Sequence, residues 1–140
     1  MIVDNQTKIE WNELGFYYEF DNAFNQWRFF GSKHGLEKLS ERIYEYAQKP
    51  GNLGISEHMH IGPYNYLKVM TWEEPIITKD YIAGTLSDLI NLSQMISNEI
   101  RLTNVGNIFK IRTQYSPKST ASLLFFIMED DFPPSFIEFD

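Results

Sequence analysis

Two stretches of this chain align without a gap: Gly31-Ser32-Lys33-His34-Gly35-Leu36-Glu37-Lys38-Leu39-Ser40-Glu41-Arg42-Ile43 and Gly84-Thr85-Leu86-Ser87-Asp88-Leu89-Ile90-Asn91-Leu92-Ser93-Gln94-Met95-Ile96. Both read Gly, then Ser or Thr, then Leu-x-x-Leu-Ser-x-x-Ile, at an offset of 53 residues. Ser and Thr are favoured helix N-caps, and this apolar spacing is that of one buried helical face. The repeat therefore predicts two capped amphipathic helices, each preceded by a strand.

Extended segments surround the two helices. Aromatic or alternating runs predict strands over residues 15–20, 25–30, 56–61, 64–72, 76–83, 107–115 and 121–128, and Lys79-Asp80 can interrupt the fifth of these. Each half then reads strand, helix, strand, strand. Unit one covers about 25–72 and unit two about 76–128, with an N-terminal strand in front and an acidic tail at 129–140.

We expect a single α+β domain over residues 1–140. A helix between strands must cover a sheet face, so two such units predict one largely antiparallel sheet with both helices on the same side, related by a pseudo-twofold axis. A chance likeness of two amphipathic helices stays open as an alternative, because capped Leu-x-x-Leu helices are common.

Composition narrows the class of protein. The 140 residues are 43% hydrophobic, which is typical of a globular chain, and they include no Cys that could form a disulfide or a thiolate site. The net charge of −7 repels phosphate backbones, and it either serves solubility alone or steers a basic partner toward the surface. No signal peptide is visible and the longest apolar run, residues 123–128, is too short to span a bilayer. We expect a cytoplasmic protein that binds neither nucleic acid nor membrane.

Few residues are candidates for chemistry. His58 and His60 lie two apart in a predicted strand and share a face, which is the start of a metal site, but Glu57 points to the other face. We favour two exposed histidines at a strand edge over a metal site. The segment 31–35 resembles a phosphate-binding loop, yet helix capping explains both copies of the repeat and anion binding explains one. Ser40 and Ser93 are predicted to be packing residues, so we expect no catalytic residue, metal or cofactor.

Acidic clusters are the remaining candidates. Glu73-Glu74, Glu129-Asp130-Asp131 and the terminal Glu138 and Asp140 do not follow the ordered pattern of a calcium loop. Carboxylates beside aromatic residues have the anatomy of a protein interface, with an anchor and a charged rim. The predicted protein-binding residues are Glu73, Glu74, Glu129, Asp130, Asp131 and Phe132. Alternatively, the tail folds back and packs its own aromatic residues.

One part of the chain resembles a known family. Phe29-Phe30-Gly31-Ser32-Lys33-His34-Gly35-Leu36-Glu37-Lys38-Leu39 followed by Ser56-Glu57-His58-Met59-His60-Ile61-Gly62-Pro63-Tyr64 is similar to small bacterial immunity proteins of polymorphic-toxin and contact-dependent growth inhibition systems. In that family a strand ends in Gly, a Gly-Leu helix follows, and a His-rich strand leads into a turn. The likeness covers residues 25–72, and the second unit departs from it.

The resemblance implies a cytoplasmic inhibitor that binds and neutralises a cognate toxin. It carries no catalytic residues over to this chain. Two alternatives stay open: a metal- or small-ligand-dependent enzyme using His58 and His60, and a homo-oligomeric module, such as a homodimer, that pairs through an open sheet edge.

Overall fold

The computed structural model describes residues 5–63 and 67–134, and these residues form an α+β fold, as predicted. In order, the elements are α1 (Asn5–Leu14), β1 (Tyr17–Asp21), β2 (Gln26–Gly31), α2 (Lys33–Gln48), the 3₁₀ helix η1 (Pro50–Asn52), β3 (His58–Ile61), β4 (Leu67–Thr71), β5 (Ile76–Ile77), β6 (Tyr81–Gly84), α3 (Leu86–Leu102), β7 (Ile108–Ile111) and β8 (Ser122–Ile127). The predicted strand 64–72 begins at 64–66 and the predicted tail ends at 135–140, which lie outside the described residues.

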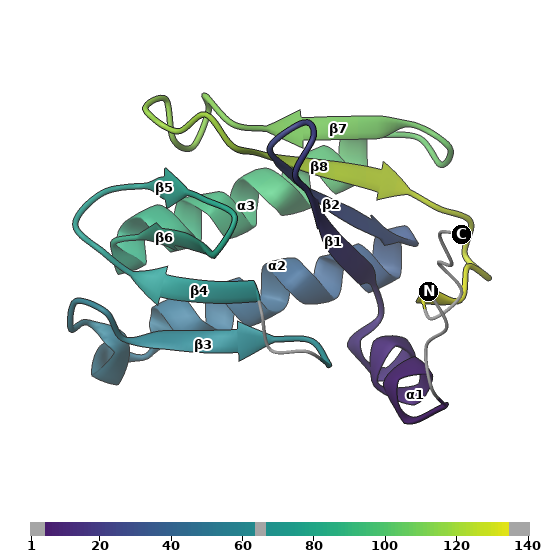
Figure 1. Ribbon diagram of the computed structural model, residues 1–140, viewed down its shortest axis with the longest axis horizontal. Helices are drawn as coiled ribbons and strands as arrows, with labels where there is room; N and C mark the ends of the chain where they lie inside the picture. The colour runs from purple at the N-terminus through teal and green to yellow at the C-terminus, as the bar shows by residue number, and fades with distance from the viewer. Residues whose placement is uncertain (1–4, 64–66, 135–140) are drawn as a thin grey trace.

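The strands form two sheets of four rather than the single sheet that we expected. Their orders are β1-β2-β8-β7 and β3-β4-β6-β5, with a parallel central pair and antiparallel outer pairs in each. Helices α2 and α3 pack against each other behind the strands (Figure 1). Each helix carries the chain from one sheet to the other. The hairpin before a helix and the hairpin after it therefore lie in different sheets and do not pair.

Each unit is a hairpin, a helix and a second hairpin. Unit one is β1-β2-α2-β3-β4 and unit two is β5-β6-α3-β7-β8. Exchanging the units turns the order β1-β2-β8-β7 into β5-β6-β4-β3, which is the other sheet. Strand β1, which we expected to be an extra strand, is therefore the counterpart of β5. The interruption at Lys79-Asp80 lies in the turn between β5 and β6.

The strand registers fix which residues are equivalent. Gly31 pairs with Ile127 in one sheet and Gly84 pairs with Thr71 in the other. One residue further on, the Met128 amide donates to the Gly31 carbonyl and the Trp72 amide donates to the Gly84 carbonyl, both at 2.8 Å. The ends of β4 and β8 are thus equivalent positions in the two units.

Both helices begin as the repeat predicts. The Ser32 hydroxyl accepts a hydrogen bond from the Gly35 amide at 3.0 Å. Thr85 and Asp88 form a capping box, in which each side chain accepts from the other's amide at 3.0 Å. The predicted apolar faces are buried, namely Leu36, Leu39, Ile43 and Ala47 in α2 and Leu89, Leu92, Ile96 and Ile100 in α3.

Aromatic side chains fill the space between the first sheet and the helices. Tyr18, Phe29, Phe125 and Phe109 are neighbours across its four strands. The Phe125 ring stacks on the Phe29 ring at 4.9 Å and on the Phe109 ring at 4.5 Å. The Tyr18 hydroxyl donates to the Ile61 carbonyl, so it joins the two sheets.

Helix α1 was not predicted. Its sequence is mostly polar, and Trp11 and Leu14 are its only buried side chains in the described structure. Trp11 packs on Tyr17 and Tyr18 with ring centroids 4.8 and 5.1 Å apart, and Gly15 (φ 96°) ends the helix. Within the ranges that the structure describes, no helix has the length and apolar character needed to cross a membrane.

Candidate binding surface

The six predicted binding residues lie in two groups. Glu73 and Glu74 follow β4, whereas Glu129, Asp130, Asp131 and Phe132 follow β8. Strands β4 and β8 end at opposite ends of the molecule (Figure 1). The structure therefore does not bring the two acidic clusters together into one site.

The carboxylates are exposed, but Phe132 does not project as an anchor. Phe132 is half-buried and packs against the hydrophobic core, and its amide donates to the Glu129 carbonyl at 3.0 Å. At the other end, the Glu74 carboxylate forms an ion pair with Lys118 at 3.2 Å, which at such exposed positions contributes little to stability.

Exposed apolar residues gather beside Glu73. Leu53 is 69% exposed and Ile55 is 51% exposed, although both are large aliphatic residues. They border a cavity of about 210 Å³ at the start of α3, which we call the β4–α3 hollow. Its lining residues are Leu53, Ile55, Thr71, Trp72, Glu73, Thr85 and Leu86. Of the six predicted binding residues, Glu73 is the one that lines the hollow.

The loop that carries Leu53 and Ile55 is held in place by hydrogen bonds. The Tyr46 hydroxyl donates to the Glu57 carbonyl at 2.6 Å, and the Thr71 hydroxyl donates to the Asn52 carbonyl at 2.7 Å. The Asn52 side chain donates to the Tyr46 carbonyl at 2.8 Å. Burial raises the pKa of the Tyr46 phenol, which keeps the donor protonated. The two apolar side chains therefore stand on an ordered segment.

Sequence reasoning missed the hollow because its walls come from distant segments. The sequence nevertheless contains a signal for this segment, which is a change in the offset between the two units. The helices align at an offset of 53 residues, but the strand register pairs His58 with Met70 and Ile108 with Phe126, so β3 and β7 align at an offset of 50. Unit one thus has three extra residues between its helix and the next strand. This segment contains η1 and supports Leu53.

Within the described ranges, the two histidines have no further metal-ligating side chain grouped with them. The His58 and His60 rings meet edge to face with centroids 5.1 Å apart, and His58 Nδ1 lies 2.9 Å from the Ser56 carbonyl. Both side chains are exposed on β3. In the described parts of the chain, no three His, Cys, Asp or Glu residues are grouped so that they could hold a metal ion.

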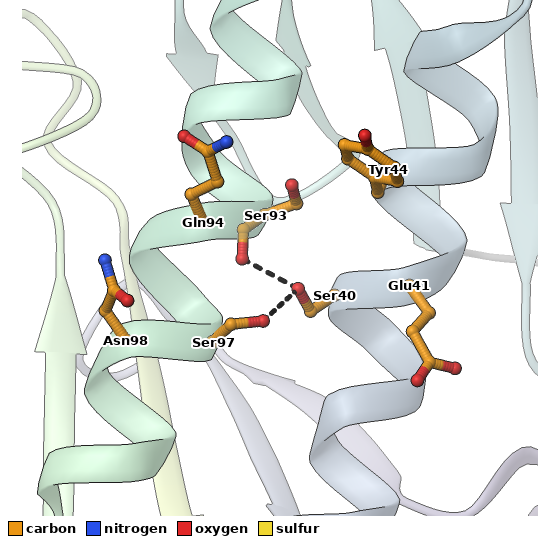
Figure 2. A pocket seen from close by; sticks show the side chains of 7 residues that line it. All are labelled: Ser40, Glu41, Tyr44, Ser93, Gln94, Ser97 and Asn98. Carbon is orange, nitrogen blue, oxygen red and sulfur yellow. Dashed lines mark hydrogen bonds between the residues drawn. The ribbon is translucent and has the colours of Figure 1, made fainter.

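The serines of the repeat lie where the two helices meet. The Ser40 hydroxyl is hydrogen-bonded to the Ser93 carbonyl and to the Ser97 hydroxyl (Figure 2). Both distances are 2.7 Å. Ser97 in turn donates to the Glu37 carboxylate at 2.6 Å. A shallow groove of about 480 Å³ runs over this contact. The Ser40 hydroxyl is thus bonded across to α3, whereas the Ser93 hydroxyl donates within α3 to the Ile90 carbonyl at 2.7 Å. Because both buried serines are satisfied inside the helix contact, they act in helix packing.

The segment 31–35 also has a structural role. An added Cβ on Gly35 would lie 1.9 Å from the Gly15 carbonyl oxygen, so the backbone that follows α1 covers the first turn of α2. This close approach requires glycine at position 35. It also places a carbonyl oxygen, which repels anions, where a phosphate would have to bind.

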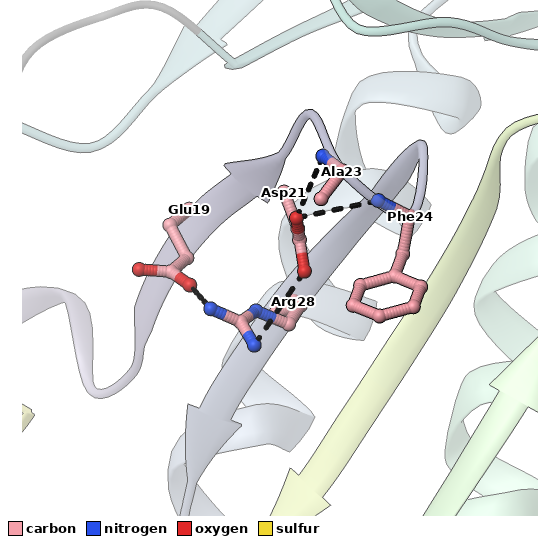
Figure 3. A network of polar contacts seen from close by, with 5 residues as sticks. All are labelled: Glu19, Asp21, Ala23, Phe24 and Arg28. Atoms are coloured by element: carbon pink, nitrogen blue, oxygen red, sulfur yellow. Dashed lines mark hydrogen bonds and ion pairs between the residues drawn. The ribbon is translucent and has the colours of Figure 1, made fainter.

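A polar network lies on the opposite face of the first sheet. Arg28 forms ion pairs with Glu19 and, at 3.7 Å, with Asp21 (Figure 3). Asp21 also accepts hydrogen bonds from the amides of Ala23 and Phe24 at 2.9 and 3.3 Å. These contacts order the β1–β2 hairpin and leave Phe24 75% exposed at its tip.

No family model matches this chain, and neither a curated protein nor a solved structure matches it. The fold and the surface define an α+β protein of two interlocked units, with an apolar hollow and exposed carboxylates at the end of β4.

Proposed function

We propose that this chain is a small acidic binding protein that neutralises a cognate bacterial toxin by direct contact, without catalysis, in the cytoplasm. The observation that carries the proposal is the β4–α3 hollow, where exposed Leu53 and Ile55 adjoin Glu73. An apolar centre with a charged rim is the usual anatomy of a protein interface.

Charge supports a basic partner. The chain has a net charge of −7, and exposed carboxylates follow both β4 and β8. Such a surface accelerates encounter with a positively charged protein and lowers affinity for nucleic acid. Toxins that act on nucleic acids need Lys and Arg to contact phosphates, so they are natural partners of an acidic inhibitor. This step rests on the resemblance to immunity proteins and is an analogy.

The test is co-expression with toxin domains encoded by genes adjacent to that of this chain. Each such domain is produced in a bacterial host with and without this chain. We expect growth to recover when both are present, and a complex to elute as one peak in gel filtration. The association rate is expected to fall as ionic strength rises, since steering is screened by salt. Absence of both rescue and complex would contradict the proposal.

A further inference from the structure

We infer that the β4–α3 hollow receives one apolar side chain of the partner, and that this side chain is flanked in the partner by Lys or Arg. The identity of the partner as a toxin rests on the proposed function. The chemistry of the contact follows from the hollow itself, as its size, its lining and its charge show.

Several polar atoms of the lining are already hydrogen-bonded within the protein, namely those of Thr71, the Trp72 amide and Thr85. The Thr71 hydroxyl bonds to Asn52 and to Tyr46, at 2.7 and 2.8 Å. The Thr71 amide donates to the Glu57 carbonyl and the Trp72 amide to the Gly84 carbonyl, both at 2.8 Å.

At the start of α3, the capping box likewise provides hydrogen bonds for the polar groups of Thr85 and Asp88. The Thr85 hydroxyl accepts from the Asp88 amide, and the Asp88 carboxylate accepts from the Thr85 amide. A polar ligand that entered the hollow would lose hydrogen bonds to water and regain few, whereas an apolar side chain would lose none. The volume of about 210 Å³ suits a single large side chain rather than a segment of chain.

The walls of the hollow are built in advance of binding. Leu53 and Ile55 lie in the connection between α2 and β3, which is three residues longer than its counterpart in unit two, and the hydrogen bonds of Asn52, Tyr46 and Thr71 fix this connection. Ser56 adopts a left-handed backbone (φ 76°), a conformation that side chains rarely take. A preformed site loses little conformational entropy when it is filled.

The carboxylates around the hollow determine which residues should flank the apolar side chain in the partner. Glu73 lines the hollow, Glu74 follows it, and Glu57 lies in the loop of Leu53 and Ile55, where its side chain packs beside Gly54. All three are exposed, and the ion pair of Lys118 with Glu74 offsets part of the charge. The local charge is therefore negative, which favours a partner with Lys or Arg next to its apolar anchor.

The test uses three short peptides of equal length as probes: acetyl-Lys-Phe-Lys-amide, acetyl-Lys-Ala-Lys-amide and acetyl-Glu-Phe-Glu-amide. Each is titrated into the isotope-labelled full chain while amide NMR shifts are recorded. We expect saturable shifts at the lining of the β4–α3 hollow with the first peptide. The affinity should be about tenfold higher than for the other two, because one lacks the apolar side chain and the other is repelled.

The two units provide matched controls. Ile55 and Val105 are equivalent by the strand registers and are 51% and 41% exposed. We expect Ile55→Ser to weaken binding of the first peptide about tenfold, and Val105→Ser to leave it unchanged. Glu73→Gln should weaken it about threefold, and the equivalent Glu129→Gln should not.

Three results would overturn the inference: equal binding of all three peptides, shifts centred outside the hollow, or equal effects of Ile55→Ser and Val105→Ser. The outcome is separable from that of the proposed function. If the chain rescues growth and Ile55→Ser rescues it equally well, the hollow is excluded as the docking site while toxin neutralisation stands. If the peptide binds in the hollow but no adjacent toxin is neutralised, the site stands and the proposed function fails.

Discussion

At the scale of single residues, Ser56 is the most informative position. Its φ of 76° is in the left-handed region, and its amide donates to the Thr71 carbonyl at 2.9 Å. The equivalent residue of unit two is Gly106, with φ 90° and an amide that donates to the Ile127 carbonyl at 2.8 Å. The same backbone is therefore occupied by glycine in one unit and by a residue with a side chain in the other.

This difference predicts opposite effects of two substitutions. Ser56→Gly should raise the free energy of unfolding by about 1 kcal/mol, because it removes the clash of a Cβ in left-handed backbone. Gly106→Ala should lower it by a similar amount, since nothing lies within 4 Å of the added Cβ and the backbone alone is responsible. Urea unfolding of both variants measures the effect. A Ser56→Gly protein less stable than the parent would refute this account.

Two buried tyrosines predict sensitivity to alkali. Burial raises the pKa of the Tyr18 and Tyr115 phenols above the ordinary value. Each phenol donates a hydrogen bond to a carbonyl, of Ile61 and Ala83, which also favours the protonated form. The unfolded chain releases these protons first, so their contribution to stability is complete below pH of about 10 and is lost above it.

The expected slope is about 1.4 kcal/mol per pH unit for each tyrosine above pH 10. Tyr18→Phe should lower the slope by that amount and should cost about 1 kcal/mol at neutral pH through the lost hydrogen bond. Unfolding free energies measured across pH 9–12 check both values. A Tyr18→Phe variant with the slope of the parent would show that this phenol does not titrate on unfolding.

At the scale of elements, the sequence predicted the helices best. Their caps and apolar spacing are local signals, and Ser32 and Thr85 cap the two helices as expected. Helix α1 was missed because only Trp11 and Leu14 contact the core, too few to set a periodic pattern. The segment 76–83 was predicted as a strand that Lys79-Asp80 can interrupt, and its division into a hairpin was not predicted because β5 has only two residues. Short elements depend on tertiary contacts that no local pattern encodes.

The contact between α2 and α3 gives an element-scale prediction. Ser40 and Ser93 are 4% and 2% exposed, so a larger side chain has no room between the helices. Ser40→Leu should lower the unfolding free energy by about 1–3 kcal/mol through overpacking. The neighbouring Glu41→Leu, at an exposed position, should change it by less than about 0.5 kcal/mol. Thermal unfolding of the two variants gives the comparison, and equal stabilities would contradict a role of Ser40 in helix packing.

At the scale of the whole molecule, the repeat identified the two units but not how they interlock. The parallel pairs β2–β8 and β4–β6 join strands of different units, and such long-range pairing leaves no trace in a local pattern. The β4–α3 hollow was not predicted for the same reason. Glu73 and Glu74 were identified from their charge, whereas the hollow beside them depends on a loop, a strand end and a helix start that fold together.

The interlocked sheets predict that neither unit folds alone. Each unit contributes one hairpin to each sheet, and an isolated two-stranded hairpin is marginal in water. Fragments 1–73 and 74–140, produced separately, should lack cooperative unfolding as monomers. When mixed, they should form a one-to-one complex whose NMR spectrum matches the intact chain, because the cut falls in the connection between β4 and β5. A monomeric fragment with its own cooperative transition would mean that one unit can bury its core without the other, and the intact fold would then be two associated domains rather than one interlocked structure.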